Sequence, residues 1–300
     1  MKAVTKIIFT DDQGMKFFGE GPCRLLRCVQ NTGSLRSAAM EMNMAYSKAT
    51  KLIKQAEAAL GFPLTTRCAG GKDGGGSVLT PEGAQWLNRY EAYRAACREA
   101  NQALYRQHFP EIGCVIMASG LGKRFGDNKL MADFCGKPMI QRALDATEGL
   151  FSHRVVVTRH DSVAALCRQQ NVDVIFHDLP YRNDTIRLGL EALGNPDACM
   201  FLPGDQPLLR RETVAMLLDA RKDNPNRIIR PVYEDTEGSP VLFPARTFAE
   251  LRNLPEGKGG SVVIQNHIHE VLRVSVSNPF ELADADTPET LEMLKGFYHD

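Results

Sequence analysis

The chain has 300 residues, which suits one large domain or two ordinary ones, and 43% of them are hydrophobic, enough for buried cores. The net charge of zero hides an asymmetry, because the first 110 residues carry 15 Lys and Arg against 9 Asp and Glu, and the rest carry 21 against 27. No apolar run approaches a membrane span, no apolar signal region opens the chain, and the eight cysteines lack Cys-x-x-Cys spacing, so we expect a cytoplasmic protein without a membrane partner, zinc knuckle or disulfide framework.

The first sixty residues predict a hairpin followed by helices. Residues 6–10 and 15–18 flank a turn at 11–14, as in a β-hairpin. Pro22 opens a helix through Val29, Ser34 can cap a second helix over 35–42, and a longer helix runs from 45 or 46 to about 60. Two helices joined by a tight turn are typical of a helix-turn-helix.

The second helix of that pair is predicted to expose a polar, cationic face. Its members are Tyr46, Ser47, Lys48, Lys51 and Lys54. A helix that enters the major groove of DNA needs such a face, and the basic first third agrees with a nucleic-acid partner. A simply solvated lysine-rich face and ordinary scatter of charge remain alternatives at this point.

A glycine-rich hairpin follows at residues 67–80, RCAGGKDGGGSVLT. Residues 70–80 resemble the wing of the molybdate-responsive ModE regulators and, more loosely, that of LysR-type regulators. The resemblance implies a winged helix-turn-helix domain over residues 1–109, with Lys48, Lys51 and Lys72 at DNA phosphates. The molybdate-binding C-terminal domains of those regulators have no counterpart here, so their molybdate sensing is not carried over.

Thr80 and Pro81 are predicted to cap and begin a long helix towards Gln107. In the ModE family this helix builds the dimer, so the resemblance implies a homodimer that binds duplex DNA. A module that only dimerises the chain remains the alternative. Residues 109–110 end the helix and begin a linker.

From residue 111 strands and helices alternate. The predicted strands are 112–117, 154–158, 172–176, 198–202, 227–232 and 270–276, and the predicted helices are 138–147, 161–169, 185–193, 211–222 and 244–251. This alternation predicts an α/β domain with a mostly parallel sheet and helices on both faces. Ligand sites are then expected at the carboxyl ends of the strands.

The loop at residues 117–129, MASGLGKRFGDNK, carries most of the chemistry. Glycines let backbone N–H groups approach an anion, and the cations Lys123, Arg124 and Lys129 can neutralise it, which suits a nucleoside triphosphate. The spacing is not that of a P-loop, and Phe125 stands where Gly-x-Gly-x-x-Gly needs glycine. Taken alone, the loop also fits a turn with solvated charges.

The loop resembles the signature of nucleotidyltransferases that share the fold of molybdopterin cytidylyl- and guanylyltransferases and of sugar-phosphate nucleotidyltransferases. Further matches follow in order: DTIRLGL at 184–190, LPGDQP at 202–207, GSPVLF at 238–243 and DADTPE at 284–289. The resemblance implies a Rossmann-like nucleotidyltransferase domain over residues 110–300. The Gly-Asp-Gln-Pro and Asp-x-Asp segments favour the cytidylyl branch.

The resemblance also implies the reaction and its residues. A terminal phosphate attacks the α-phosphorus of CTP with Mg²⁺, and pyrophosphate leaves. The nucleotide is held by Ala118, Ser119, Gly120, Gly122, Arg124, Lys129, Thr185 and Asp205, with Arg124 and Lys129 as the catalytic cations and Asp205 and Asp286 as metal ligands. Alternatively Asp205 caps a turn, and Thr185 and Asp286 cap helices.

Two departures concern the acceptor side of the site. Ser239 stands where the family often has His, and residues 257–261, GKGGS, replace Gly-Asp-x-Gly-Ala-Arg. Molybdopterin, the molybdenum cofactor, is the expected acceptor. Two alternatives stay open: another acceptor such as a sugar or alditol phosphate, and a transcription regulator whose transferase-like half only senses nucleotide or cofactor.

Overall fold

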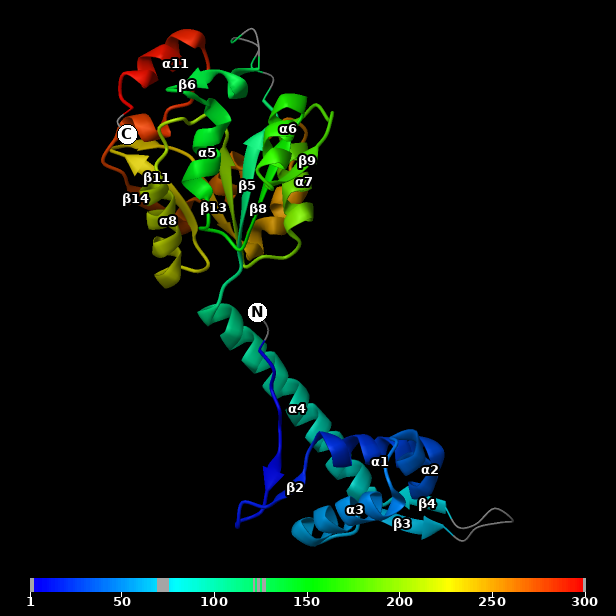
Figure 1. Cartoon of the computed structure of the whole chain (residues 1–300). Coiled ribbons are helices and arrows are strands. Elements are labelled where there is room, and N and C mark those ends of the chain that lie inside the picture. The colour runs from blue at the N-terminus through cyan, green and yellow to red at the C-terminus, as the bar shows by residue number, and fades with distance from the viewer. Residues whose placement is uncertain (1–2, 69–75, 121, 123–124, 126–127, 299–300) are drawn as a thin grey trace. The chain divides into compact units, whose positions relative to one another are not determined.

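The computed structural model describes the chain except residues 1–2, 69–75, 121, 123–124, 126–127 and 299–300. It divides into two compact units, Met1–His108 and Phe109–Asp300, which are described separately (Figure 1). Within the described residues, no helix has both the length and the apolar character needed to cross a membrane.

The N-terminal unit contains the predicted hairpin, helices and wing strands. Its elements are β1 (Phe9–Thr10), β2 (Lys16–Phe18), α1 (Glu20–Thr32), α2 (Leu35–Glu41), α3 (Tyr46–Leu60), β3 (Thr65–Cys68), β4 (Gly76–Leu79) and α4 (Pro81–His108). The first helix is longer than predicted: it begins at Glu20, before Pro22, and reaches Thr32, where Gly33 ends it in the left-handed conformation at φ 66°.

The pair α2–α3 forms the predicted helix-turn-helix. The Ser34 hydroxyl accepts a hydrogen bond from the backbone of Ser37 and caps α2, and Asn43 turns the chain with φ 51°. Helix α3 buries Ala49, Ile53 and Ala56 in the core of the unit. Its polar face remains exposed, as predicted; that face comprises Tyr46, Ser47, Lys48, Lys51 and Lys54.

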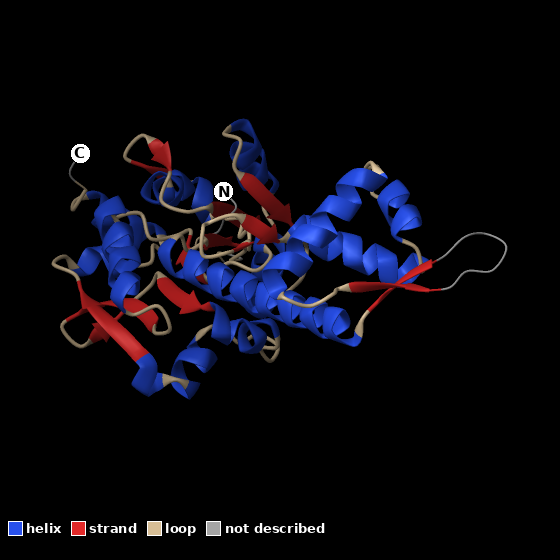
Figure 2. Cartoon of the chain, turned by 90° about the horizontal axis from the view of Figure 1, so that it is seen from below, coloured by secondary structure: helices blue, strands red, loops and turns tan. Residues whose placement is uncertain are grey.

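The wing strands β3 and β4 pair antiparallel, with Thr65 opposite Leu79 (Figure 2). The tip of the predicted wing, including Lys72, lies outside the described residues. Thr80 caps α4 as predicted, because its hydroxyl accepts from Gly83 N at 2.9 Å. Gly83 is required here, since a Cβ atom would lie 2.2 Å from the carbonyl oxygen of Leu64.

The C-terminal unit is built on an eight-stranded sheet in the order β12-β11-β13-β10-β5-β8-β9, with β14 beside β11. The six predicted strands are all present: β5 (Ile112–Ala118), β8 (His153–Thr158), β9 (Asp173–Phe176), β10 (Ala198–Pro203), β11 (Ile228–Tyr233) and β14 (Val271–Ser275). The run β10-β5-β8-β9 is parallel. The prediction omitted β12 (Thr236–Glu237) and β13 (Val241–Pro244). Strand β12 pairs antiparallel with β11, and β13 pairs antiparallel with β10 and β11, so the sheet is mixed.

Helices cover both faces of this sheet, as predicted (Figure 1). One face packs on α5 (Met139–Thr147), α6 (Asp161–Gln169), α8 (Arg211–Asp223) and α11 (Pro288–Lys295), and the other on α7 (Arg182–Leu193), α9 (Phe248–Arg252) and α10 (Ser261–Asn266). Alternate residues of β5 serve the two cores, Ile116 the first and Val115 the second.

Short elements connect these layers. They are η1 (Lys129–Met131), β6 (Asp133–Phe134), β7 (Lys137–Pro138), η2 (Ala245–Thr247), η3 (Ile268–Glu270) and η4 (Pro279–Leu282). Two helix predictions need correction. The helix expected over 244–251 is η2 followed by α9, and α7 begins at Arg182, three residues before the predicted start.

Candidate functional site

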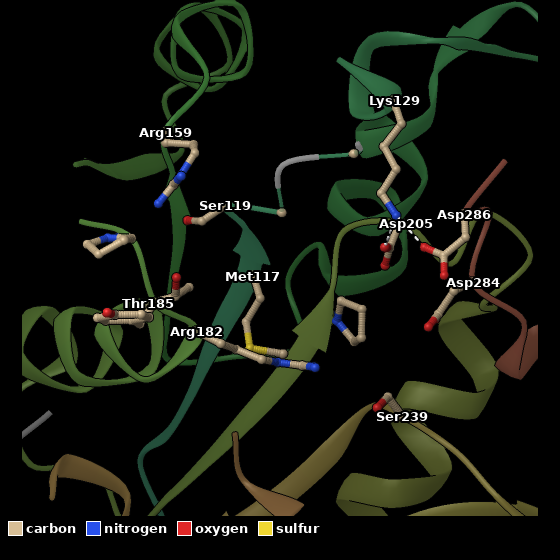
Figure 3. A pocket seen from close by; sticks show the side chains of 15 residues that line it. Met117, Ser119, Lys129, Arg159, Arg182, Thr185, Asp205, Ser239, Asp284 and Asp286 are labelled. Carbon is tan, nitrogen blue, oxygen red and sulfur yellow. Dashed lines mark hydrogen bonds and ion pairs between the residues drawn. The ribbon is translucent and has the colours of Figure 1, made fainter. Parts of the chain in front are cut away.

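A pocket of about 580 Å³ lies at the carboxyl ends of the parallel strands (Figure 3). Its lining comes from the segments after β5, β8 and β10, from η1 and the start of α7, and from two loops, one before β13 and one before α11. Side chains distant in sequence therefore meet at the edge of the sheet where ligand sites were expected.

On one side of the pocket an ammonium group joins two carboxylates. Lys129 Nζ lies 2.6 Å from Asp205 Oδ2 and 2.8 Å from Asp286 Oδ1. The Lys129 side chain is only 8% exposed. Burial disfavours its charge, but the two carboxylates outweigh that cost, and the pKa of Lys129 is raised above its ordinary value. Lys129 thus remains charged at neutral pH.

Local structure explains why these groups converge. Asn128 Oδ1 accepts from Leu130 N and begins η1, the turn that carries Lys129. Gly204 lies close against β5, since its N–H donates to Met117 O at 3.0 Å and a Cβ atom there would lie 3.3 Å from the same oxygen. Ala285 N donates to Asp205 O at 2.9 Å, so the loop with Asp286 is fastened directly to the end of β10.

A third carboxylate, that of Asp284, lines the same side. The buried side chain of Gln206 donates to Asp284 Oδ1 at 3.0 Å. Burial, followed by the charge of Asp205, raises the pKa of Asp284. Asp284 is therefore less readily ionised than an ordinary aspartate.

The loop that carries Asp284 and Asp286 is anchored by a buried glutamate. Glu281 is fully buried, and its carboxylate accepts from Arg210 Nη2 at 2.6 Å and from the Thr213 hydroxyl. Arg210 caps α8 and Thr213 lies in its first turn. A charge-assisted bond into a buried acceptor holds the loop against this helix.

The opposite side of the pocket carries Ser119, Arg159 and Thr185 (Figure 3), and Tyr181 also lines the pocket. Thr185 is buried and is the fourth residue of α7, so the alternative that it caps this helix is wrong. The cap is Tyr181, whose backbone N–H donates to Asp184 Oδ2 at 3.2 Å. Thr185 instead lines the pocket.

The structure brings most of the predicted site residues together. Ser119, Gly120, Gly122, Lys129, Thr185, Asp205 and Asp286 all line the pocket. Ala118 is buried at the end of β5 and is not among the lining residues. Arg124 lies outside the described residues. The cap alternative for Asp286 is wrong, because Thr287 caps α11.

Sequence analysis overlooked two arginines of the pocket, Arg159 and Arg182. Arg159 follows the end of β8, so a search for polar residues after every parallel strand would have found it. Arg182 was missed because α7 was started too late. Arg182 lines the pocket together with Met117 and Ser239, which Figure 3 also labels.

The carboxylates fit a divalent cation. Asp205 and Asp286 direct oxygens to one cationic atom, the Lys129 nitrogen, so their geometry already converges on a positive charge. Among the described residues, no group of three or more His, Cys, Asp and Glu side chains forms a metal cage. Two carboxylates completed by phosphate oxygens and water suit Mg²⁺, which rarely uses all-protein cages.

A parallel sheet whose strand ends carry glycines, a lysine and converging carboxylates defines a class of protein that handles nucleotide phosphates. Residues 114–271, more than half of the chain, match the model of the MobA-like NTP transferase domain, so the chain belongs to this family. Residues 23–84 match the model of the bacterial regulatory helix-turn-helix protein of the lysR family. The family resemblances and the fold class predicted from the sequence are thereby confirmed.

Two curated relatives cover different parts of the chain. The molybdenum-pterin-binding protein MopB of Rhodobacter capsulatus is 38% identical over 71 residues, which are 24% of this chain and 26% of that protein. The probable molybdenum cofactor guanylyltransferase of Aquifex aeolicus is 27% identical over 111 residues, 37% of this chain and 54% of that protein. The chain thus spans only about a quarter to a half of these relatives.

Solved structures show that the fold is shared. Rv0371c from Mycobacterium tuberculosis gives a TM-score of 0.57 at 22% identity, over 62% of this chain and 98% of that chain. A second structure of Rv0371c, in complex with manganese, gives 0.53 at 20% identity, over 63% and 100%. Nearly two thirds of the chain therefore shares its fold with these structures.

Proposed function

We propose that residues 110–300 transfer a cytidylyl group from CTP to molybdopterin in a Mg²⁺-dependent reaction, and that residues 1–109 form a winged helix-turn-helix domain that binds duplex DNA as a homodimer. The observation that carries the enzymatic half is the convergence of Asp205 and Asp286 on the Lys129 ammonium, within a pocket at the strand ends. A purely structural ion pair would not need a pocket of about 580 Å³ beside it.

In the proposed reaction an oxygen of the acceptor phosphate bonds to the α-phosphorus of CTP. The bond from that phosphorus to the bridging oxygen breaks, and pyrophosphate leaves with the electron pair. Little proton transfer is needed, so the protein acts by positioning and by stabilising charge. Asp205 and Asp286 would hold Mg²⁺, which supplies positive charge to the phosphates. Lys129 and Arg124 add fixed cations, and Ser119, Gly120 and Gly122 border the nucleotide.

The choice of CTP and of molybdopterin rests on resemblance. Residues 117–126 and 202–207 resemble the cytidylyl branch of the family. The names of the two curated relatives point to molybdenum and pterin. The Aquifex relative is named as a guanylyltransferase, so GTP is the nucleotide against which CTP must be compared.

The deciding experiment incubates the purified full chain with CTP, GTP, ATP or UTP, Mg²⁺ and molybdopterin, and measures pyrophosphate. We expect release with CTP to exceed release with every other nucleotide. Faster turnover with GTP would overturn the nucleotide assignment. Turnover with a sugar or alditol phosphate in place of molybdopterin would overturn the acceptor. Nucleotide binding without any turnover would favour a regulator that only senses nucleotide.

A further inference from the structure

His177 lies directly after β9 and beside the pocket, and it touches two segments of the pocket wall. Its side chain is almost fully buried, and the residue is 8% exposed. The ring Nε2 lies 2.8 Å from Ser119 Oγ, and the ring Nδ1 lies 3.2 Å from the backbone nitrogen of Leu179. Neither contact has a role in the reaction as described above.

The partners of the ring determine where its proton sits. Leu179 N is a donor, so Nδ1 must accept. The Ser119 hydroxyl donates to Val157 O at 3.0 Å, which leaves its oxygen to accept from Nε2. Both bonds are satisfied only by a neutral imidazole with its hydrogen on Nε2.

This ring connects two walls of the pocket. Ser119 belongs to the loop after β5, and residues 177–182 lead from β9 into α7. Pro180, Tyr181 and Arg182 of that second segment line the pocket together with Ser119. Leu179 is held on its other side as well, because Arg159 donates to its carbonyl oxygen. The position of the 177–182 segment thus depends on His177 and Arg159.

We propose that His177 is a positioning residue for the nucleotide: its neutral ring fixes the Ser119 loop and the 177–182 segment at the spacing that the nucleotide requires, and protonation releases the segment. This inference rests on the proposed function of the pocket. A proton on Nδ1 would place one N–H against the N–H of Leu179, and that hydrogen bond would be lost.

The surroundings keep the ring neutral. Burial, followed by the positive charge of Arg159, lowers the pKa of His177 below its ordinary value of 6.5. Asp184 and Asp178 act in the opposite direction, and Arg187 of α7 acts with Arg159. A lowered pKa in the folded state means that the neutral ring is retained at neutral pH and is lost only as pH falls below 6.5. The nucleotide site therefore has an acid limit.

The test measures binding of CTP to the full chain by calorimetry with Mg²⁺ between pH 5 and 8. Three variants are compared. His177→Phe keeps a ring but removes both hydrogen bonds, and His177→Gln keeps a donor and an acceptor that do not titrate. His153→Gln is the matched control, because His153 is exposed, pairs with Asp173 and lies at the opposite end of β8. Thermal melting of each variant establishes that it folds.

We expect the dissociation constant of the wild type to rise by up to about tenfold per pH unit in acid, the limit for one proton. His177→Phe should weaken binding about tenfold at pH 8, as expected for lost positioning. His177→Gln should bind within a few-fold at pH 8 and lose the acid limit, and His153→Gln should keep the wild-type profile. An acid limit that persists in His177→Gln, or unchanged affinity in His177→Phe, would overturn this role and leave the proposed transferase standing. If calorimetry with CTP, GTP, ATP and UTP shows that the wild type binds none of them, both proposals are wrong.

Discussion

Lys129 links two carboxylates on one side of the pocket that would otherwise repel each other. An ammonium between two acids is a stable arrangement without a ligand, since it neutralises charge in a partly buried site. In the proposed reaction the two carboxylates would hold Mg²⁺, and Lys129 would supply a second positive charge beside the phosphates.

Asp205→Asn should abolish metal-dependent transfer and leave the fold intact. An amide carries no charge to hold Mg²⁺ against the triphosphate, so we expect the rate to fall by about a hundredfold or more at ordinary Mg²⁺. Pyrophosphate release against Mg²⁺ concentration and the melting temperature are the measurements. Asp219→Asn, which alters an exposed pair with Lys222, serves as control. Near-normal turnover in Asp205→Asn would show that this carboxylate does not hold the metal.

Among the elements, α7 brings Arg182 and Thr185 to the pocket, and the loop at 257–260 packs against the start of this helix. Gly257 N donates to Asn183 Oδ1 at 3.0 Å, which fastens the loop to the first turn of α7. Gly259 lies against Arg182, since a Cβ atom there would be 3.3 Å from its Cδ. The segment that departs from the family pattern thus packs against Arg182, an exposed residue that lines the pocket together with Ser239.

Arg182→Gln should weaken the acceptor more than the nucleotide. A guanidinium can hold a phosphate through two hydrogen bonds, whereas glutamine is shorter and carries no charge. We expect the KM for molybdopterin to rise by about tenfold, as for a lost charged hydrogen bond, while the KM for CTP changes little. Arg182→Lys should restore part of the loss. Equal increases in both KM values would instead place Arg182 at the nucleotide.

Local signals explain which elements were predictable. Ser34 and Thr80 cap helices with their own side chains, and the apolar run of β10 is continuous. By contrast, α7 is capped by Tyr181, an unusual residue there, so its start was misplaced. The strand β13 is four residues long and follows a proline, which made it look like a loop.

Sequence analysis predicted the pocket residues that belong to segments resembling a known family. Asp205, Asp286 and Lys129 fall in segments that resemble a family, and the structure brings an oxygen of each aspartate within 2.8 Å of Lys129 Nζ. Arg159 and His177 belong to no such segment. Arg159 and His177 come near Ser119 because they follow β8 and β9, which lie beside β5 in the parallel sheet. The spacing of these residues in the sequence does not show which strands are neighbours.

At the scale of the whole molecule, the chain joins a LysR-type helix-turn-helix to a nucleotidyltransferase. The two units have separate cores, and the basic excess belongs to the first. The proposed function would thus combine nucleotidyl transfer and DNA binding in one polypeptide. Substitutions on the exposed face of α3 distinguish a first unit that binds DNA from one that only dimerises the chain.

The full chain should bind duplex DNA as a dimer, on a near-palindromic site with half-sites roughly 34 Å apart. Lys48 and Lys51 are exposed on α3, and with Lys72 they are the proposed phosphate contacts, so affinity should fall steeply with salt. Lys48→Gln and Lys51→Gln should each weaken binding and reduce the salt slope by about 1. The control is Lys222→Gln, an exposed lysine of the transferase unit that pairs with Asp219. Binding selection followed by salt titration provides both measurements. If no sequence is enriched and no salt-sensitive duplex binding appears, the module only dimerises the chain, and the proposal for the transferase is unaffected.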